Sequence, residues 1–109
     1  MNSKIAILGG AGFLGTRFAN RLEQSTYDFG IYDTDISNGS TVFVDVEDSS
    51  SLEAIKDCSV IVNLAAVHRD DIKPISRYDD VNVNGAINVC NIARKYGIKK
   101  IIFTSSVAV

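Results

Sequence analysis

The chain has 109 residues, of which 46% are hydrophobic and 22% are charged, so its composition is that of one globular domain and not of a disordered segment. The formal net charge is −2 and the lysines and arginines are scattered, which excludes the basic surface expected of a protein that binds nucleic acid or an anionic membrane. The apolar run near the N-terminus is too short for a signal sequence or a membrane span, and we expect a cytoplasmic protein with a small polar partner.

The first half of the chain alternates strands and a helix. Residues 4–8 are a continuous apolar run that ends at two glycines, which is typical of a strand buried on both faces of a parallel sheet. A helix is predicted from Gly12, because apolar residues recur every four positions. These residues, which should form its buried face, are Leu14, Phe18 and Leu22. Residues 29–32 and 41–44 are predicted as the second and third strands, with a turn at residues 38–40.

The second half repeats the alternation. Residues 50–57 are predicted as a short helix, because the first four, Ser-Ser-Leu-Glu, have the spacing of a capping box. Residues 60–64 form an apolar run that predicts the fourth strand. A longer helix is predicted over about residues 78–96, with Gly97 as its C-terminal cap and a fifth strand over residues 98–104. The apolar stripe of the long helix is expected at Val83, Ala86, Val89, Cys90 and Ala93.

This order predicts an α/β fold: a Rossmann-type doubly wound parallel sheet with helices on both faces and strand order 3-2-1-4-5. No repeat or linker divides the chain, so residues 1–109 are expected to form one domain. Cys58 and Cys90 form no Cys-x-x-Cys pattern and lie in apolar stretches, so buried reduced thiols are expected, without a disulfide or a metal site. A ligand should bind beyond the carboxyl ends of the strands, between the first and the fourth.

The strongest functional signal is the segment 9–15, Gly-Gly-Ala-Gly-Phe-Leu-Gly, which lies between a buried strand and an amphipathic helix. Gly9 can make the tight turn, and Gly12 lets a pyrophosphate approach the N–H groups at the helix N-terminus. Gly15 lets the helix pack close to the strand. A P-loop is excluded because no Gly-Lys-Ser/Thr follows. The alternative is an ordinary glycine-rich turn without a ligand.

Asp33 ends the second predicted strand, 18 positions beyond Gly15. A carboxylate at this position can accept hydrogen bonds from the adenosine ribose of a dinucleotide, and its charge would repel the additional phosphate of NADP. NAD is therefore the predicted cofactor. Asp35 is a competing candidate, in which case Asp33 is a solvated turn residue, and Arg17 leaves NADP binding open.

Five segments of the chain, taken in order, resemble motifs of one known family. They are residues 7–15 (Ile-Leu-Gly-Gly-Ala-Gly-Phe-Leu-Gly), 45–46 (Asp-Val), 62–66 (Val-Asn-Leu-Ala-Ala), 82–86 (Asn-Val-Asn-Gly-Ala) and 103–109 (Phe-Thr-Ser-Ser-Val-Ala-Val). The family is that of the extended short-chain dehydrogenases/reductases, whose opening motif is matched except that Leu8 replaces the usual Thr. Within the family, the pattern is most similar to nucleotide-sugar 4-epimerases, 4,6-dehydratases and 4-keto-reductases.

The resemblance implies a role for each matching residue. Ser106 corresponds to the catalytic Ser that hydrogen-bonds the substrate where hydride is exchanged, although a polar strand end is the alternative. Asn82 corresponds to a structural, water-holding Asn. His68 lies where some epimerases place a Lys near the nicotinamide ribose, although an isolated loop His is more often a surface residue. The resemblance also implies that the pair Asp45–Val46 meets the adenine of the cofactor. The implied cofactor-binding residues are Gly9, Gly12, Phe13, Leu14, Gly15, Asp33, Asp45, Val46, Leu64, Ala65, Ala66, His68, Asn82 and Ser105.

The resemblance implies an NAD-dependent enzyme that removes hydride from a nucleotide-diphosphate sugar, forms a transient keto intermediate and returns the hydride, with epimerisation, dehydration or reduction as the outcome. The family's Tyr-x-x-x-Lys pair, its acid/base group, is missing from residues 1–109. We therefore expect the chain to be the N-terminal part of an NAD-binding Rossmann domain, truncated after the fifth strand and inactive by itself, from a homodimeric parent. The alternatives are a non-catalytic dinucleotide-binding sensor of the same fold and a small-carbonyl reductase of the same family.

Overall fold

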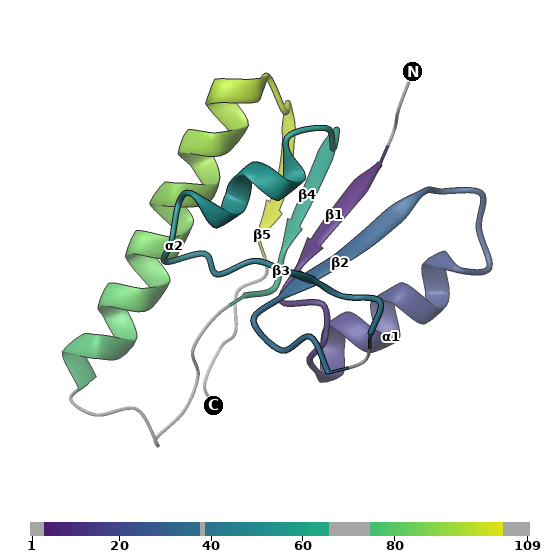
Figure 1. Ribbon diagram of the computed structural model, residues 1–109, viewed down its shortest axis with the longest axis horizontal. Helices are drawn as coiled ribbons and strands as arrows, with labels where there is room; N and C mark the ends of the chain where they lie inside the picture. Colours follow the sequence, from purple (N-terminus) through teal and green to yellow (C-terminus); the bar gives the residue numbers. More distant parts are fainter. Residues whose placement is uncertain (1–3, 38, 66–74, 104–109) are drawn as a thin grey trace.

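The computed structural model describes residues 4–37, 39–65 and 75–103, and it shows a parallel sheet between two helical layers (Figure 1). The elements in chain order are β1 (Ile5–Leu8), α1 (Phe13–Leu22), β2 (Phe29–Asp33), β3 (Val42–Phe43), the 3-10 helix η1 (Ser51–Ile55), β4 (Val60–Asn63), α2 (Ile75–Tyr96) and β5 (Lys100–Phe103). The five strands have the order β3-β2-β1-β4-β5 and every neighbouring pair is parallel. The predicted fold class and strand order are confirmed.

The central strand β1 is buried on both faces of the sheet. Successive side chains of a strand point to opposite faces, so Ala6 and Leu8 face one layer and Ile7 faces the other. Ile7 packs with Ala19 and Leu22 of α1 in a small cluster. Fully burying a side chain such as Leu or Ile stabilises the fold by roughly 1.5–3 kcal/mol. The continuous apolar run of β1 therefore serves two cores at once.

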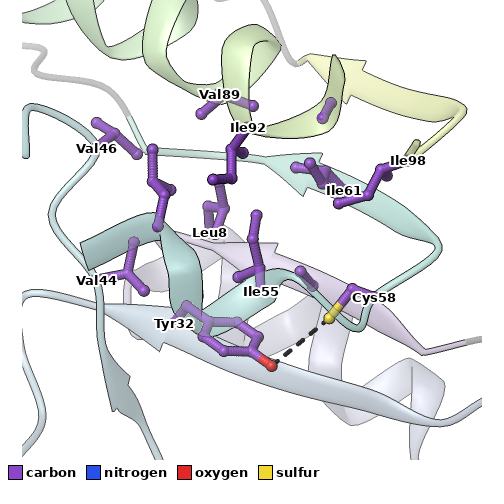
Figure 2. Close-up of a cluster of buried hydrophobic side chains, with 13 residues drawn as sticks. Leu8, Tyr32, Val44, Val46, Ile55, Cys58, Ile61, Val89, Ile92 and Ile98 are labelled. Atoms are coloured by element: carbon purple, nitrogen blue, oxygen red, sulfur yellow. Dashed lines mark hydrogen bonds between the residues drawn. The ribbon is translucent and has the colours of Figure 1, made fainter. Parts of the chain in front are cut away.

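The larger core lies under α2 and η1. Side chains from β1, β2, β4, the segment after β3 and both of these helices converge there (Figure 2). The fully buried side chains of this core with the largest volumes are Leu8, Leu52, Ile55, Ile61 and Val89. The Tyr32 hydroxyl lies 3.7 Å from the Cys58 thiol within this core. Burial raises the pKa of both groups, which disfavours the reactive thiolate form of Cys58. Cys58 is free and buried as expected, whereas Cys90 is free and only half-buried.

The buried face of α1 differs from the predicted one. Leu14 is 54% exposed, and the face toward the sheet consists of Gly15, Ala19 and Leu22, with Phe18 half-buried at its side. A spacing of four residues drifts around a helix of 3.6 residues per turn, so only part of the predicted stripe can face the sheet. The close contact of Gly15 with the preceding loop fixes which part does.

The long helix α2 begins earlier than predicted, and its N-terminal half departs from the expected stripe. Val83 is 56% exposed, whereas Val89 and Ala93 are buried. The predicted C-terminal cap is confirmed: Gly97 has a φ of +70°, and the N–H of Ile98 donates to the carbonyl of Ala93 at 2.8 Å. This is the bond pattern of a Schellman motif, which satisfies carbonyls at the helix end.

The capping box predicted at Ser50 is wrong. Ser50 makes no capping hydrogen bond with its side chain, and the short helix is a 3-10 helix that begins at Ser51. The hydroxyl of Ser51 bonds instead to the backbone of the segment that precedes the helix, where it accepts from the Asp45 N–H at 2.9 Å. The predicted third strand is also shorter than expected, because only Val42 and Phe43 pair with β2.

Candidate functional site

The turn after β1 requires glycine at Gly9 for two reasons. Its φ is +77°, a left-handed conformation that side-chain-bearing residues rarely adopt. A Cβ at this position would also lie 2.7 Å from the backbone nitrogen of Ala65, in the segment that follows β4. The N–H of Gly9 donates to the carbonyl of Tyr32 at 2.7 Å. The turn therefore packs against the ends of β2 and β4, the two strands that flank β1.

The other two motif glycines face different surroundings. A Cβ on Gly15 would lie 2.4 Å from the Cα of Gly10, so Gly15 lets the helix approach the glycine loop and not the strand, which was the predicted contact. A Cβ on Gly12 would meet only the carbonyl oxygen of Gly9, at 3.7 Å. Space is thus left open at Gly12, at the start of the helix.

The N-terminus of α1 is suited to an anion. Gly12 is the N-cap residue and supplies no side-chain hydrogen bond, and the first turn contains no acidic residue. The first N–H groups of a helix lack intrahelical partners and carry the positive end of the helix dipole. A phosphate placed in the open space beside Gly12 would meet these donors.

Asp33 lies directly against the glycine loop. Its Oδ2 accepts a hydrogen bond from the N–H of Ala11 at 3.0 Å, and its Oδ1 accepts from the N–H of Asp35 at 3.1 Å. A carboxylate offers about four acceptor positions, so capacity remains for the hydroxyls of a ribose. Asp35 is exposed, and hydrogen bonds from Ser37 lower its pKa. The geometry therefore favours Asp33 over Asp35 as a ligand of the loop site.

The segment after β3 lies next to Asp33. The N–H of Val44 donates to the carbonyl of Asp33 at 3.1 Å, which brings Asp45 and Val46 to the same edge of the sheet. The carboxylate of Asp45 accepts from the N–H of Glu47 at 3.0 Å. Val46 is buried, and Asp45 is half-buried. An acceptor is thus held at the edge of the sheet, one strand further out than Asp33.

The end of β4 closes the other side of the site. The N–H of Leu64 donates to the carbonyl of Leu8 at 2.8 Å, and the side-chain oxygen of Asn63 accepts from the N–H of Ala65 at 3.0 Å. Asn63 is only 6% exposed. This buried amide orients the strand end. Asn63 was not among the predicted site residues, although an Asn inside an apolar run is the signal that the sequence offers for it.

The structure brings together four elements of the predicted site: the glycine loop, Asp33, the Asp45–Val46 pair and the end of β4. Phe13 begins α1 with Leu14 exposed beside it, and Asn82 is half-buried on α2. The remaining predicted site residues lie outside the described residues; they are Ala66, His68, Ser105 and Ser106.

The described residues were also compared with the requirements of a metal site and of a membrane span. No three His, Cys, Asp or Glu side chains gather as a potential metal site within residues 4–37, 39–65 and 75–103. No helix in those ranges has the length and apolar character that a membrane span needs.

Residues 5–109 match a family described as the NAD dependent epimerase/dehydratase family. The chain belongs to this family. Its description agrees with the predicted family and with the predicted cofactor. The match covers the whole described site, from the glycine loop to the end of β5.

Individual relatives agree with this assignment. The chain is 44% identical to the N-acetyl-alpha-D-glucosaminyl-diphospho-ditrans,octacis-undecaprenol 4-epimerase of Escherichia coli O157:H7, with 100% of this chain and 34% of that protein covered. It is 25% identical to the UDP-glucose 4-epimerase of Brucella ovis, solved in complex with NAD, with a TM-score of 0.84 over 96% of this chain and 36% of that one. It is 28% identical to the dTDP-glucose 4,6-dehydratase of Bacillus anthracis, also solved with NAD, with a TM-score of 0.76 over 94% and 37%. The chain thus spans about a third of the length of these relatives.

Proposed function

We propose that this chain is the N-terminal part of the NAD-binding domain of an enzyme that epimerises a nucleotide-diphosphate sugar through a transient keto intermediate. The observation that carries the proposal is the position of the Asp33 carboxylate, which is bonded to Ala11 of the glycine loop beside the uncapped start of α1. This arrangement offers neighbouring sites for a ribose and a pyrophosphate. Membership in an NAD-dependent family supports the assignment.

The arrangement of the described residues supports a dinucleotide along the carboxyl edge of the sheet. The N–H groups at the start of α1 would hold the pyrophosphate, and Asp33 would accept from the ribose. Asp45 and Val46 would lie at the adenine, and Leu64 and Ala65 at the nicotinamide side. NAD, when bound, accepts a hydride from the sugar and returns it. The role of the protein is to orient the two partners and to exclude water between them.

The charge of Asp33 gives the experiment for this assignment. Calorimetric titration of the intact protein should show tighter binding of NAD than of NADP, because the carboxylate accepts from the ribose and repels a phosphate. Asp33→Asn keeps an oxygen for the Ala11 N–H but removes the charge, so it should narrow the preference. Asp35→Asn is the matched control and should leave the preference unchanged. Tighter NADP binding by the unmodified protein would refute the proposal.

Ser106 is proposed to hydrogen-bond the reacting oxygen of the sugar. The segment that contains it follows β5, whose last residue, Phe103, is paired with Asn63 at the end of β4. Ser106→Ala should lower turnover of the intact enzyme by about ten- to a thousandfold with little change in NAD affinity. The acid/base pair would come from outside residues 1–109, so the chain alone should not turn over substrate. Measurable turnover by residues 1–109 would contradict this.

A second candidate substrate is a sugar linked to a polyprenyl diphosphate. The specific observation is the 44% identity to the Escherichia coli enzyme named for such a substrate. Both substrate classes carry the sugar on a diphosphate, and they differ in the group beyond it. Assays of the intact protein with UDP-N-acetylglucosamine and with the undecaprenyl-diphosphate form of the sugar distinguish the two substrates. If the protein epimerises neither, the proposed reaction is overturned.

We expect the intact enzyme to be a cytoplasmic homodimer. Sedimentation tests the oligomeric state, and cell fractionation tests the location.

A further inference from the structure

The helix α2 is joined to the segment after β3 by a hydrogen bond between residues that are far apart in the sequence. The side-chain amide of Asn88 donates to the carbonyl of Val46 at 2.8 Å, across 42 positions of sequence. One turn earlier on the helix, a Cβ on Gly85 would lie 2.7 Å from Cγ2 of Val46. The backbone of α2 therefore approaches Val46 as closely as it can, and Asn88 bonds the carbonyl beside it.

A second contact fixes the residue before Val46. The hydroxyl of Ser51 accepts from the N–H of Asp45 at 2.9 Å, and it lies 2.8 Å from the carbonyl oxygens of Asp45 and Asp48, to one of which it donates. The N–H of Glu47 orients the Asp45 carboxylate by a bond to Oδ1. The backbone of the Asp45–Val46 pair is thus bonded on both sides, once by η1 and once by α2.

The pair lies where the base of the cofactor would be. Val44 donates to the carbonyl of Asp33, so the pair is the next group outward from the proposed ribose position. The base is attached directly to that ribose. Asp45 presents a carboxylate, which accepts hydrogen bonds, and adenine carries an amino group that donates them. Hypoxanthine carries a carbonyl in the same position, which would face the carboxylate without a proton between them.

We propose that Asn88 is a positioning residue that sets the base preference of the cofactor site by holding the Val46 carbonyl and, through it, the Asp45 carboxylate. This inference rests on the proposed function, since it assumes that NAD binds at this edge. Without the amide donor, the partly buried Val46 carbonyl loses its hydrogen-bond partner, and the segment gains freedom to move away from the base. Asp45 then no longer discriminates between an amino group and a carbonyl.

The test is Asn88→Leu in the intact protein, which keeps the size of the side chain and removes the donor. The affinity for NAD should fall about tenfold, the scale of one lost hydrogen bond, while the affinity for nicotinamide hypoxanthine dinucleotide changes less than about twofold. Asn91→Leu is the matched control, because Asn91 is exposed on the same helix and accepts a hydrogen bond from Arg94 of that helix, at 3.3 Å. It should leave both affinities unchanged.

The outcomes separate this inference from the proposed function. If the unmodified protein fails to bind NAD, the proposed function fails and the inference fails with it. If the unmodified protein binds NAD and the Asn88 variant loses both dinucleotides by the same factor, or loses neither, Asn88 has only a structural role and the inference alone is overturned. If Asn88→Leu does not give a cooperative thermal transition, Asn88→Ser, which leaves room for water at the carbonyl, is titrated in its place with the same expected change in base preference.

Discussion

The glycine loop and the Asp45–Val46 pair contribute to the same edge of the sheet but are held in different ways. The loop depends on the conformation of Gly9 and on the close contact between Gly10 and Gly15, all within seven residues. The pair depends on a donor on α2, 42 residues away. The left-handed φ of Gly9 is a local requirement that the sequence shows, whereas a contact or hydrogen bond between distant elements is visible only once the chain has folded.

We expect the largest loss of stability from a substitution at Gly9 in the glycine loop. Gly9→Ala introduces a Cβ at a φ of +77° and within 2.7 Å of the Ala65 nitrogen, so strain and overlap with backbone add. We expect a loss of roughly 2–5 kcal/mol in the free energy of unfolding. Gly97→Ala is the matched control: its φ is +70°, but its Cβ would meet nothing within 4 Å, and it should cost only about 1–2 kcal/mol. Equal losses in urea unfolding would show that the contact with Ala65 is unimportant.

The second prediction concerns the 3-10 helix η1, which holds the backbone of the Asp45–Val46 pair. Leu52 of η1 is fully buried in the larger core, and Leu52→Ala should cost about 2–5 kcal/mol through lost burial and the cavity left behind. Leu14→Ala is the control, because Leu14 is 54% exposed on α1 and should cost less than about 1 kcal/mol. Thermal unfolding without cofactor measures both. Similar losses would contradict the assigned position of η1 in the core.

The sequence predicted the elements that depend on local chemistry. The apolar run of β1, the glycine turn and the cap at Gly97 are each specified by neighbouring residues, and each was predicted correctly. The strand order followed from the alternation of strands and helices, since parallel neighbours need crossovers.

The failures arise where tertiary contacts override local pattern. Ser50 and Glu53 have capping-box spacing, but Ser51 bonds to Asp45 and Glu53 bonds to the end of α2, so no capping box forms. Leu14 and Val83 fit helical stripes yet are exposed, because close glycine contacts determine how each helix faces the sheet. Nothing in the local sequence around Asn88 indicates its partner.

A change at Gly12 should separate folding from cofactor binding within the glycine loop. Gly12→Ser supplies an N-cap hydroxyl, which should stabilise α1 by a few tenths of a kcal/mol. The same side chain would occupy the open space at the helix start and compete for its N–H groups, so NAD affinity should fall by about tenfold or more. Gly12→Val adds bulk without a cap and should bind still more weakly while it remains folded. A Gly12→Ser protein with unchanged NAD affinity would place the pyrophosphate elsewhere.

We expect the smallest change in stability at the exposed contact between Glu53 of η1 and the end of α2, which depends on pH. Glu53 accepts from the hydroxyl of Tyr96 and from Lys95, whose Nζ lies 2.9 Å away. These bonds, that from Tyr96 first, lower the pKa of Glu53, so its contribution to stability is present above the ordinary carboxyl pKa and is lost as the pH falls through the lowered value. Glu53→Gln should therefore lower Tm slightly at about pH 7, and the difference in Tm should shrink as the pH falls through the lowered pKa of Glu53. Because the pair is exposed, added salt should shrink the difference at neutral pH. A difference in Tm that persisted unchanged at low pH would mean that the charge of Glu53 is not what ties η1 to α2.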